Sequence, residues 1–132
     1  KGGDRMSMLP LYDSNSELVA WLKLRDGIQH IFDTDLNWIA FVKNGNIRSA
    51  DDNNWLGKLN QYNCLDRHGR VYLWCPKSDF VSGTSRPATP ARPGRPARPA
   101  RPARPATPAR PPRPARPSHG WSELSLGEWL NQ

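Results

Sequence analysis

Proline stands at every third position from Pro87 to Pro117, and this period divides the chain into two physically different parts. Proline fixes its own φ near the polyproline II value and pushes the preceding residue into the same region. It also lacks the N–H that helices and sheets need. Collagen is excluded because its triple helix requires glycine at every third position, and only Gly94 occurs in this run. The sequence therefore predicts a left-handed polyproline II rod, rising ~3.1 Å per residue, within residues 81–118.

The predicted rod also accounts for the net charge of the chain. Residues 1–85 contain ten Lys or Arg and ten Asp or Glu, whereas residues 86–132 contain nine Arg against two Glu. Arg precedes Pro in most triplets, so successive Arg form a ridge with a spacing of ~9 Å. This ridge can bind nucleic acid or another polyanion through salt-dependent contacts, or it can keep a spacer extended and soluble. The candidate anion-binding residues are Arg92, Arg95, Arg98, Arg101, Arg104, Arg110, Arg113 and Arg116.

The front of the chain contains four similar units: "YDSNSELVAWLKL" from Tyr12, "FDTDLNWIAFVKN" from Phe32, "SADDNNWLGKLNQ" from Ser49 and "LDRHGRVYLWC" from Leu65. Apolar and polar residues alternate in these units, and "RDG" and "NGN" are typical hairpin turns. The units therefore predict a meander of about eight short strands. The expected ranges are 9–12, 18–24, 28–32, 38–43, 47–49, 55–59, 64–65 and 71–75.

Two kinds of residue recur at fixed places in the units. Small residues dominate one strand position, which suggests that the units crowd around a common axis; Ala20, Ala40, Gly57 and Leu73 occupy it. Each unit also has one tryptophan, namely Trp21, Trp38, Trp55 or Trp74. The alternating pattern favours a place for these rings in the core and its rim. The alternative is a stacking platform for bases or sugars.

These units, the opening "PLYDSNSELVAWL", the proline triplets and the closing "WSELSLGEWL" together resemble the bacterial family called the 4-fold β-flower protein. The resemblance covers nearly the whole chain. It implies a small all-β fold of four petal-like units, and it brings no established biochemical activity. The fold expected is therefore an all-β meander of four hairpin repeat units, followed by a polyproline II tail and a short C-terminal helix.

The sequence offers no reaction chemistry that we can identify. "DSNSE" and "DTDLN" resemble the start of a calcium loop but lack its later Gly and Glu, so they are interpreted as turns capped by Asp and Asn. His30 is expected to be a partly buried strand residue, His68 a turn residue, and His119 belongs to no metal or triad pattern. Cys64 and Cys75 are expected to be reduced, because diagonal strand neighbours lie too far apart for a disulfide. The sequence predicts no enzyme, no cofactor and no metal site.

The last segment, "GWSELSLGEWLNQ", is rich in large apolar residues that have little to bury against locally. Ser122 or Ser125 can begin a short helix, and Ser125 with Glu128 has the spacing of a capping box. A helix of ten residues is marginal alone in water, so it needs a surface to dock on; the alternative is a frayed end. The candidate docking residues are Trp121, Leu124, Trp129 and Leu130.

The parts therefore predict an N-terminal extension (1–7), a β domain (8–80), a rod (81–118) and a docking segment (119–132). We expect a structural or interaction protein whose rod presents the docking segment at a distance from the domain, for self-assembly or for tethering a protein partner. Polyanion binding through the arginines is the alternative. The sequence shows no apolar run that could span a membrane and no signal peptide, which predicts a cytoplasmic protein without membrane insertion.

Overall fold

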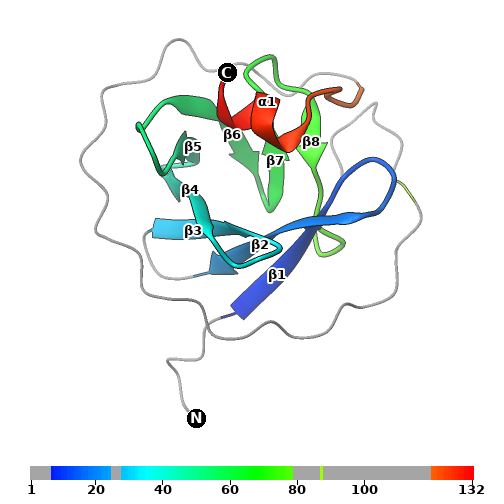
Figure 1. The fold of residues 1–132 in the computed structure, drawn as a ribbon. Helices are drawn as coiled ribbons and strands as arrows, with labels where there is room; N and C mark the ends of the chain where they lie inside the picture. Colours follow the sequence, from blue (N-terminus) through cyan, green and yellow to red (C-terminus); the bar gives the residue numbers. More distant parts are fainter. Residues whose placement is uncertain (1–6, 25–27, 79–86, 88–119) are drawn as a thin grey trace.

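A computed structural model describes residues 7–24, 28–78, 87 and 120–132 of the chain (Figure 1). Eight antiparallel strands follow one another as a meander, each paired with the next in sequence. This confirms the predicted all-β meander. The strands are β1 (Ser7–Tyr12), β2 (Leu18–Leu24), β3 (Ile28–Asp33), β4 (Trp38–Lys43), β5 (Asn46–Ser49), β6 (Trp55–Asn60), β7 (Asn63–Leu65) and β8 (Val71–Leu73).

The first and last parts of the meander meet, so the sheet curls into a nearly closed barrel. The backbone N–H groups of Tyr12 and Trp74 each donate to the other residue's carbonyl oxygen at 2.8 Å. The indole Nε1 of Trp74 also donates to the carbonyl of Asp13 at 2.9 Å. Such closure pairs strand edges that would otherwise be exposed.

Each of the four units carries a β-bulge at the same place. Tyr12 pairs with Leu18 while Leu11 pairs with Ala20, which leaves one residue of β2 unpaired. The same shift occurs between β3 and β4, between β5 and β6, and between β7 and β8. A bulge adds local twist and bends the strand, which helps a small sheet to curl. The four bulged residues are Val19, Ile39, Leu56 and Tyr72.

The small residues predicted to face a common axis do point inward. Ala20, Ala40 and Leu73 are fully buried in the inner core, the cluster of apolar side chains enclosed by the barrel. Gly57 has φ +148°, and a Cβ placed there would clash with the backbone carbonyl oxygen of Leu65. The close approach of two strands therefore requires glycine at this position.

The four repeated tryptophans lie in the core and its rim, as predicted, but outside the inner core: Trp21, Trp55 and Trp74 are buried and Trp38 is half-buried. Inward positions are taken by residues such as Ala20 and Leu22, and alternation turns Trp21 to the opposite face. Trp38 likewise pairs with Phe32, which is adjacent to the inward-facing Ile31. Trp74 belongs to a second buried cluster, with Tyr12, Leu65 and Val71.

One short helix, α1 (Leu126–Leu130), lies outside the sheet in the part of the chain that the structure describes. Figure 1 shows it packed on the side formed by β6, β7 and β8. No helix in the described ranges is long and apolar enough to cross a membrane. The predicted polyproline II rod lies outside the described residues.

Candidate docking site of the C-terminal segment

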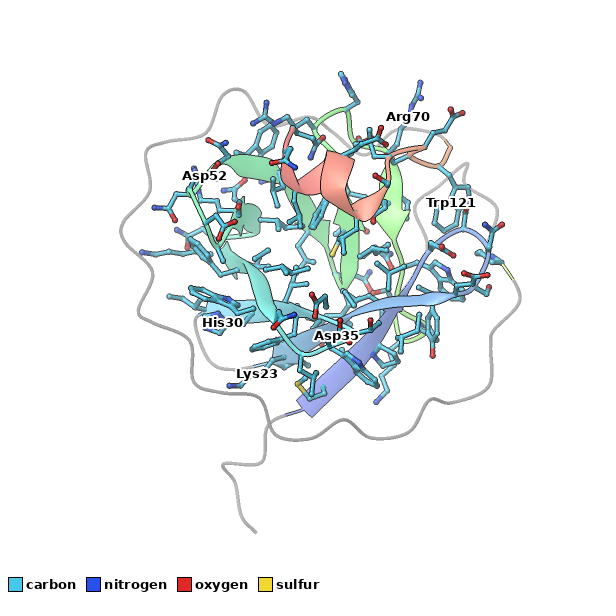
Figure 2. All side chains as sticks on the ribbon, viewed as in Figure 1. Lys23, His30, Asp35, Asp52, Arg70 and Trp121 are labelled. Atoms are coloured by element: carbon cyan, nitrogen blue, oxygen red, sulfur yellow. The ribbon has the colours of Figure 1, made fainter. Side chains whose placement is uncertain are left out.

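The C-terminal segment, residues 120–132, joins the β domain first through its backbone. The amide of Ser122 donates to the carbonyl of Val71 at 2.8 Å, and the amide of Val71 donates to the carbonyl of Gly120 at 3.4 Å. Trp121 forms a parallel bridge with Val71 and packs on the second cluster. It is labelled at the edge of the domain in Figure 2. The segment thus pairs with β8 through one parallel bridge, a short form of the strand addition by which sheet edges bind peptides.

A capping box then begins α1, as the sequence predicts. The amide of Glu128 donates to Ser125 Oγ at 3.2 Å, and the amide of Ser125 donates to Glu128 Oε1 at 2.8 Å. These bonds satisfy amides that a helix start would otherwise leave unpaired. The cap therefore sets the direction in which α1 crosses the barrel.

Trp129 is the residue by which α1 enters the inner core. Its side chain is 0% exposed, its ring centroid lies 5.1 Å from that of Tyr72, and its Nε1 donates to the carbonyl of Leu65 at 3.2 Å. Leu124, Leu126 and Leu130 are partly buried against the same core. Burial raises the pKa of the Tyr72 phenol above its usual range, with smaller contributions from Cys64 and Asp13. The Tyr72 hydroxyl therefore stays protonated beneath the helix at neutral pH.

The terminal side chain of Gln132 completes the contact, and the sequence analysis did not foresee it. Its Nε2 donates to the carbonyl of Leu56 at 2.7 Å, while its Oε1 accepts from the amide of Arg67 at 3.0 Å. Leu56 is a bulged residue of β6, and a bulge leaves backbone groups without their ladder partners. No periodicity or motif marks a terminal Gln as a ligand for such groups.

The structure brings all four candidate docking residues onto the β domain of their own chain. Trp129 is fully buried, while Trp121, Leu124 and Leu130 are partly buried. In the structure, residues 120–132 therefore complete the β domain of their own chain, and presentation of this segment at a distance by the rod stays a prediction. The segment buries its apolar side chains here because a free end would expose two tryptophans to water.

The arginines proposed to bind anions, Arg92, Arg95, Arg98, Arg101, Arg104, Arg110, Arg113 and Arg116, lie outside the described residues, as does His119. His30 lies on β3, 9% exposed, with its ring edge-on to Trp38, in agreement with its expected strand role. His68 is exposed in the turn after β7, as predicted. Cys64 and Cys75 are buried free thiols, which confirms that prediction.

The Asp-rich loops are turns, as the sequence analysis favoured. Asp33 Oδ1 accepts from the amides of Asp35 and Asn37, both at 2.9 Å. Asp13 Oδ1 accepts two amides in the same way, and so does Asp66 Oδ1. Ser49 replaces the Asp in the third loop, where its Oγ accepts from the amide of Asp51 at 3.2 Å. Among the described residues, no group of three or more His, Cys, Asp or Glu is arranged to hold a metal ion.

Comparison with known proteins identifies the family but brings no further relative. No curated protein and no solved structure is significantly similar to this chain. The family described as "4-fold beta flower protein" matches residues 9–130, which include the four hairpin units, the proline-rich stretch and the docked segment. The four bulged hairpins and the closing segment agree with that match, and the chain belongs to the 4-fold β-flower family.

Proposed function

We propose that this protein is a structural or interaction protein in which the C-terminal segment serves as the connector, including between copies of the chain. The observation that carries the proposal is Trp129, which enters the inner core of a domain whose last described strand ends at Leu73. Peptides that supply one buried aromatic anchor and a few backbone bonds are a common basis of protein association.

The length of chain before the segment supports exchange between copies. Residues 79–119 separate Ser78, buried against the domain, from Gly120 at β8. At ~3.1 Å per residue, this stretch reaches ~120 Å when extended as polyproline II. The segment of one copy can therefore reach the β domain of a second copy, and exchange of an identical element is a low-cost route to oligomers.

Light scattering of the full chain over a wide concentration range tests the proposal. We expect the mass to rise above that of one chain, and Trp129→Ala to abolish the rise because the exchanged anchor is lost. Gln132→Ala is a milder variant in case Trp129→Ala does not fold, and Glu123→Ala is the exposed control within the same segment. A single-chain mass for the full chain at every concentration would reject self-assembly.

A second candidate function is polyanion binding through the arginines that precede proline. It is favoured by the charge distribution, since residues 1–85 are balanced and the excess of +7 lies beyond them. Phosphate contacts of this kind are non-specific and weaken steeply with salt. An electrophoretic shift with DNA and RNA at two salt concentrations tests it. Binding that disappears when the eight arginines are changed to Gln supports this function, and no shift at low salt rejects it.

A further inference from the structure

The outside of the barrel carries large aromatic and cationic side chains in register across several strands. Lys23 pairs with His30, His30 with Phe41, Phe41 with Arg48 and Arg48 with Trp55. In a neighbouring row, Trp21 pairs with Phe32 and Phe32 with Trp38. Figure 2 shows Lys23 and His30 together on the outside of β2 and β3. We call this set the outer belt; it comprises Trp21, Lys23, His30, Phe32, Trp38, Phe41, Arg48 and Trp55.

The outer belt is buried although it lies on the outer face of the sheet. Phe32 and Phe41 are 1% exposed, and Trp21 and Trp55 are 5% exposed. The outer face of a small antiparallel sheet normally meets water unless another element packs on it. Within the described part of the chain, α1 is the one helix; it packs on the side formed by β6, β7 and β8, and Trp129 Nε1 donates to the carbonyl of Leu65. The belt therefore needs a different cover.

The polar atoms of the belt indicate the chemistry of that cover. The indole Nε1 atoms of Trp38 and Trp55 are buried, and neither has a hydrogen-bond partner. Arg48, 6% exposed, already donates from Nη1 to the carbonyl of Asn53 at 2.9 Å. The two unpartnered indole N–H groups call for acceptors. The cover should thus supply apolar surface and many carbonyl oxygens, and few donors of its own.

We propose that the outer belt is a binding surface for polyproline II and that its occupant is residues 87–117 of the same chain. A polyproline II strand has no internal hydrogen bonds, so its carbonyls are free to accept, and its prolines have no N–H. Aromatic-lined surfaces are the usual receptors for such strands. The Pro and Ala ridges would lie on the aromatic rings, and the Arg ridge would face outward.

The length of residues 87–117 and the positions of the flanking residues Ser78 and Gly120 agree with a path over the outer belt. Ser78 lies by the turn between β6 and β7, where its Oγ accepts from the amide of Tyr62 at 2.8 Å, and Gly120 lies at β8. Ser78 and Gly120, which flank the segment, therefore both lie close to β7 and β8. Eight strands ~4.8 Å apart and tilted by ~40° give an outer path of ~90 Å once side chains are included. Residues 87–117 extend over a similar ~90 Å as polyproline II.

Charge complementarity adds to the fit. The loops that immediately precede the strand starts at Trp38 and Trp55 contain the exposed acids Asp35, Asp51 and Asp52. Figure 2 labels Asp35 and Asp52 on these loops. A rod lying on the belt would bring its Arg ridge beside these acids, where surface pairs favour one orientation while contributing little energy each.

Acrylamide quenching of tryptophan fluorescence in the full chain tests the proposal. One variant changes five prolines to glycine, at Pro93, Pro96, Pro99, Pro102 and Pro105, and so removes the polyproline II preference. Its matched control changes the preceding arginines to glutamine, at Arg92, Arg95, Arg98, Arg101 and Arg104. We expect a several-fold rise in the quenching constant for the proline variant, little change for the arginine variant, and retained β-sheet circular dichroism in both.

Adding a peptide of residues 86–118 to the proline variant should restore protection. Equal quenching of the wild type and the proline variant would overturn the proposal, and so would a similar rise in the arginine variant. Light scattering on the same samples separates this proposal from self-assembly. Tryptophan protection in a single-chain species supports binding of residues 87–117 to the outer belt, whether or not the chain self-assembles. Protection that appears only when the mass doubles would overturn the assignment of the occupant to the same chain.

Discussion

At the scale of single residues, the barrel depends on a few backbone positions that only certain side chains can occupy. A positive φ occurs three residues after the first Asp of three loops, at Ser16 (61°), Leu36 (65°) and Gly69 (86°), and four residues after Ser49 in the remaining loop, at Asn53 (63°). This left-handed conformation is costly for most residues, so the surrounding hydrogen bonds must enforce it. The Asp at the start of the loop supplies them by accepting backbone amides.

Asp33→Ala should therefore destabilise the fold by ~1 kcal/mol, because the turn amides of Asp35 and Asn37 lose their acceptor. Asp35→Ala is the matched control, since Asp35 is exposed in the same loop, and it should change stability by less than ~0.5 kcal/mol. Urea unfolding followed by circular dichroism measures both. Equal effects of the two substitutions would show that the turn does not depend on the Asp33 carboxylate.

Gly57→Ala should destabilise the protein by ~3 kcal/mol or more, because the new Cβ would meet backbone atoms and the residue has φ +148°. Backbone atoms cannot turn away as a flexible side chain can. Gly127→Ala provides the control, since a Cβ there meets nothing within 4 Å and lies in a helix. That substitution should be neutral or stabilising by up to ~1 kcal/mol. Thermal unfolding of both variants checks the contrast, and a small loss at Gly57 would contradict the close strand approach.

At the scale of elements, α1 is too short to be stable alone and exists because of its cap and its contacts. Five residues, Leu126–Leu130, form the helix, whereas isolated helices in water need roughly 12–15 residues. The capping box stabilises the first turn of α1, and Trp129 anchors the helix by donating to the carbonyl of Leu65. Gln132, just after the helix, donates to the carbonyl of Leu56 on β6. The helix is therefore better described as the last piece of the barrel than as a separate element.

Ser125→Ala removes the oxygen that accepts from Glu128 and should cost ~1 kcal/mol. Because α1 is coupled to the inner core through Trp129, we expect this loss in the global unfolding transition. Hydrogen exchange should also show faster exchange of the Trp129 indole N–H. Glu123→Ala, exposed and upstream of the cap, should leave both measurements unchanged. Exchange that rises in α1 without any change in global stability would mean that the helix detaches independently.

At the scale of the whole molecule, the barrel encloses ionisable groups in their neutral form. Burial first, and then the nearby Cys75, raise the pKa of the Cys64 thiol far above its usual range, and burial does the same for Tyr72. In the unfolded chain these groups ionise near their ordinary values of ~8.5 and ~10. Alkaline conditions therefore favour the unfolded state.

The contribution of Cys64 and Tyr72 to the free energy of unfolding should be constant from neutral pH to about pH 8.5. Above that value it should fall. In this range the unfolded state releases protons that the folded state retains, and each such group contributes a slope of ~1.4 kcal/mol per pH unit once fully ionised. Urea titrations between pH 7 and 10.5 measure the slope. Cys64→Ala should reduce it between pH 9 and 10, and an unchanged slope would show that Cys64 ionises in the folded state.

Local patterns in the sequence determined the strands, the turns and the cap. The strand ranges, the Asp and Asn turns and the Ser125–Glu128 pair follow from alternation and from side-chain bonds to nearby amides, which act over two to five residues. The inward position of Ala20, Ala40 and Gly57 could also be predicted, because it recurs in every unit.

Only the tertiary structure decided that the outer face of the strands is buried as well, and where the C-terminal segment lies. Alternation separates Trp21 from the inward-facing Ala20 but does not say that both faces of the strand are buried, as they are here. The bulges that shift Leu56 and Tyr72 leave no mark in a simple apolar pattern. Trp129 and Gln132 find their partners across more than sixty residues, and such contacts depend on the shape of the assembled barrel, which no short stretch of sequence encodes.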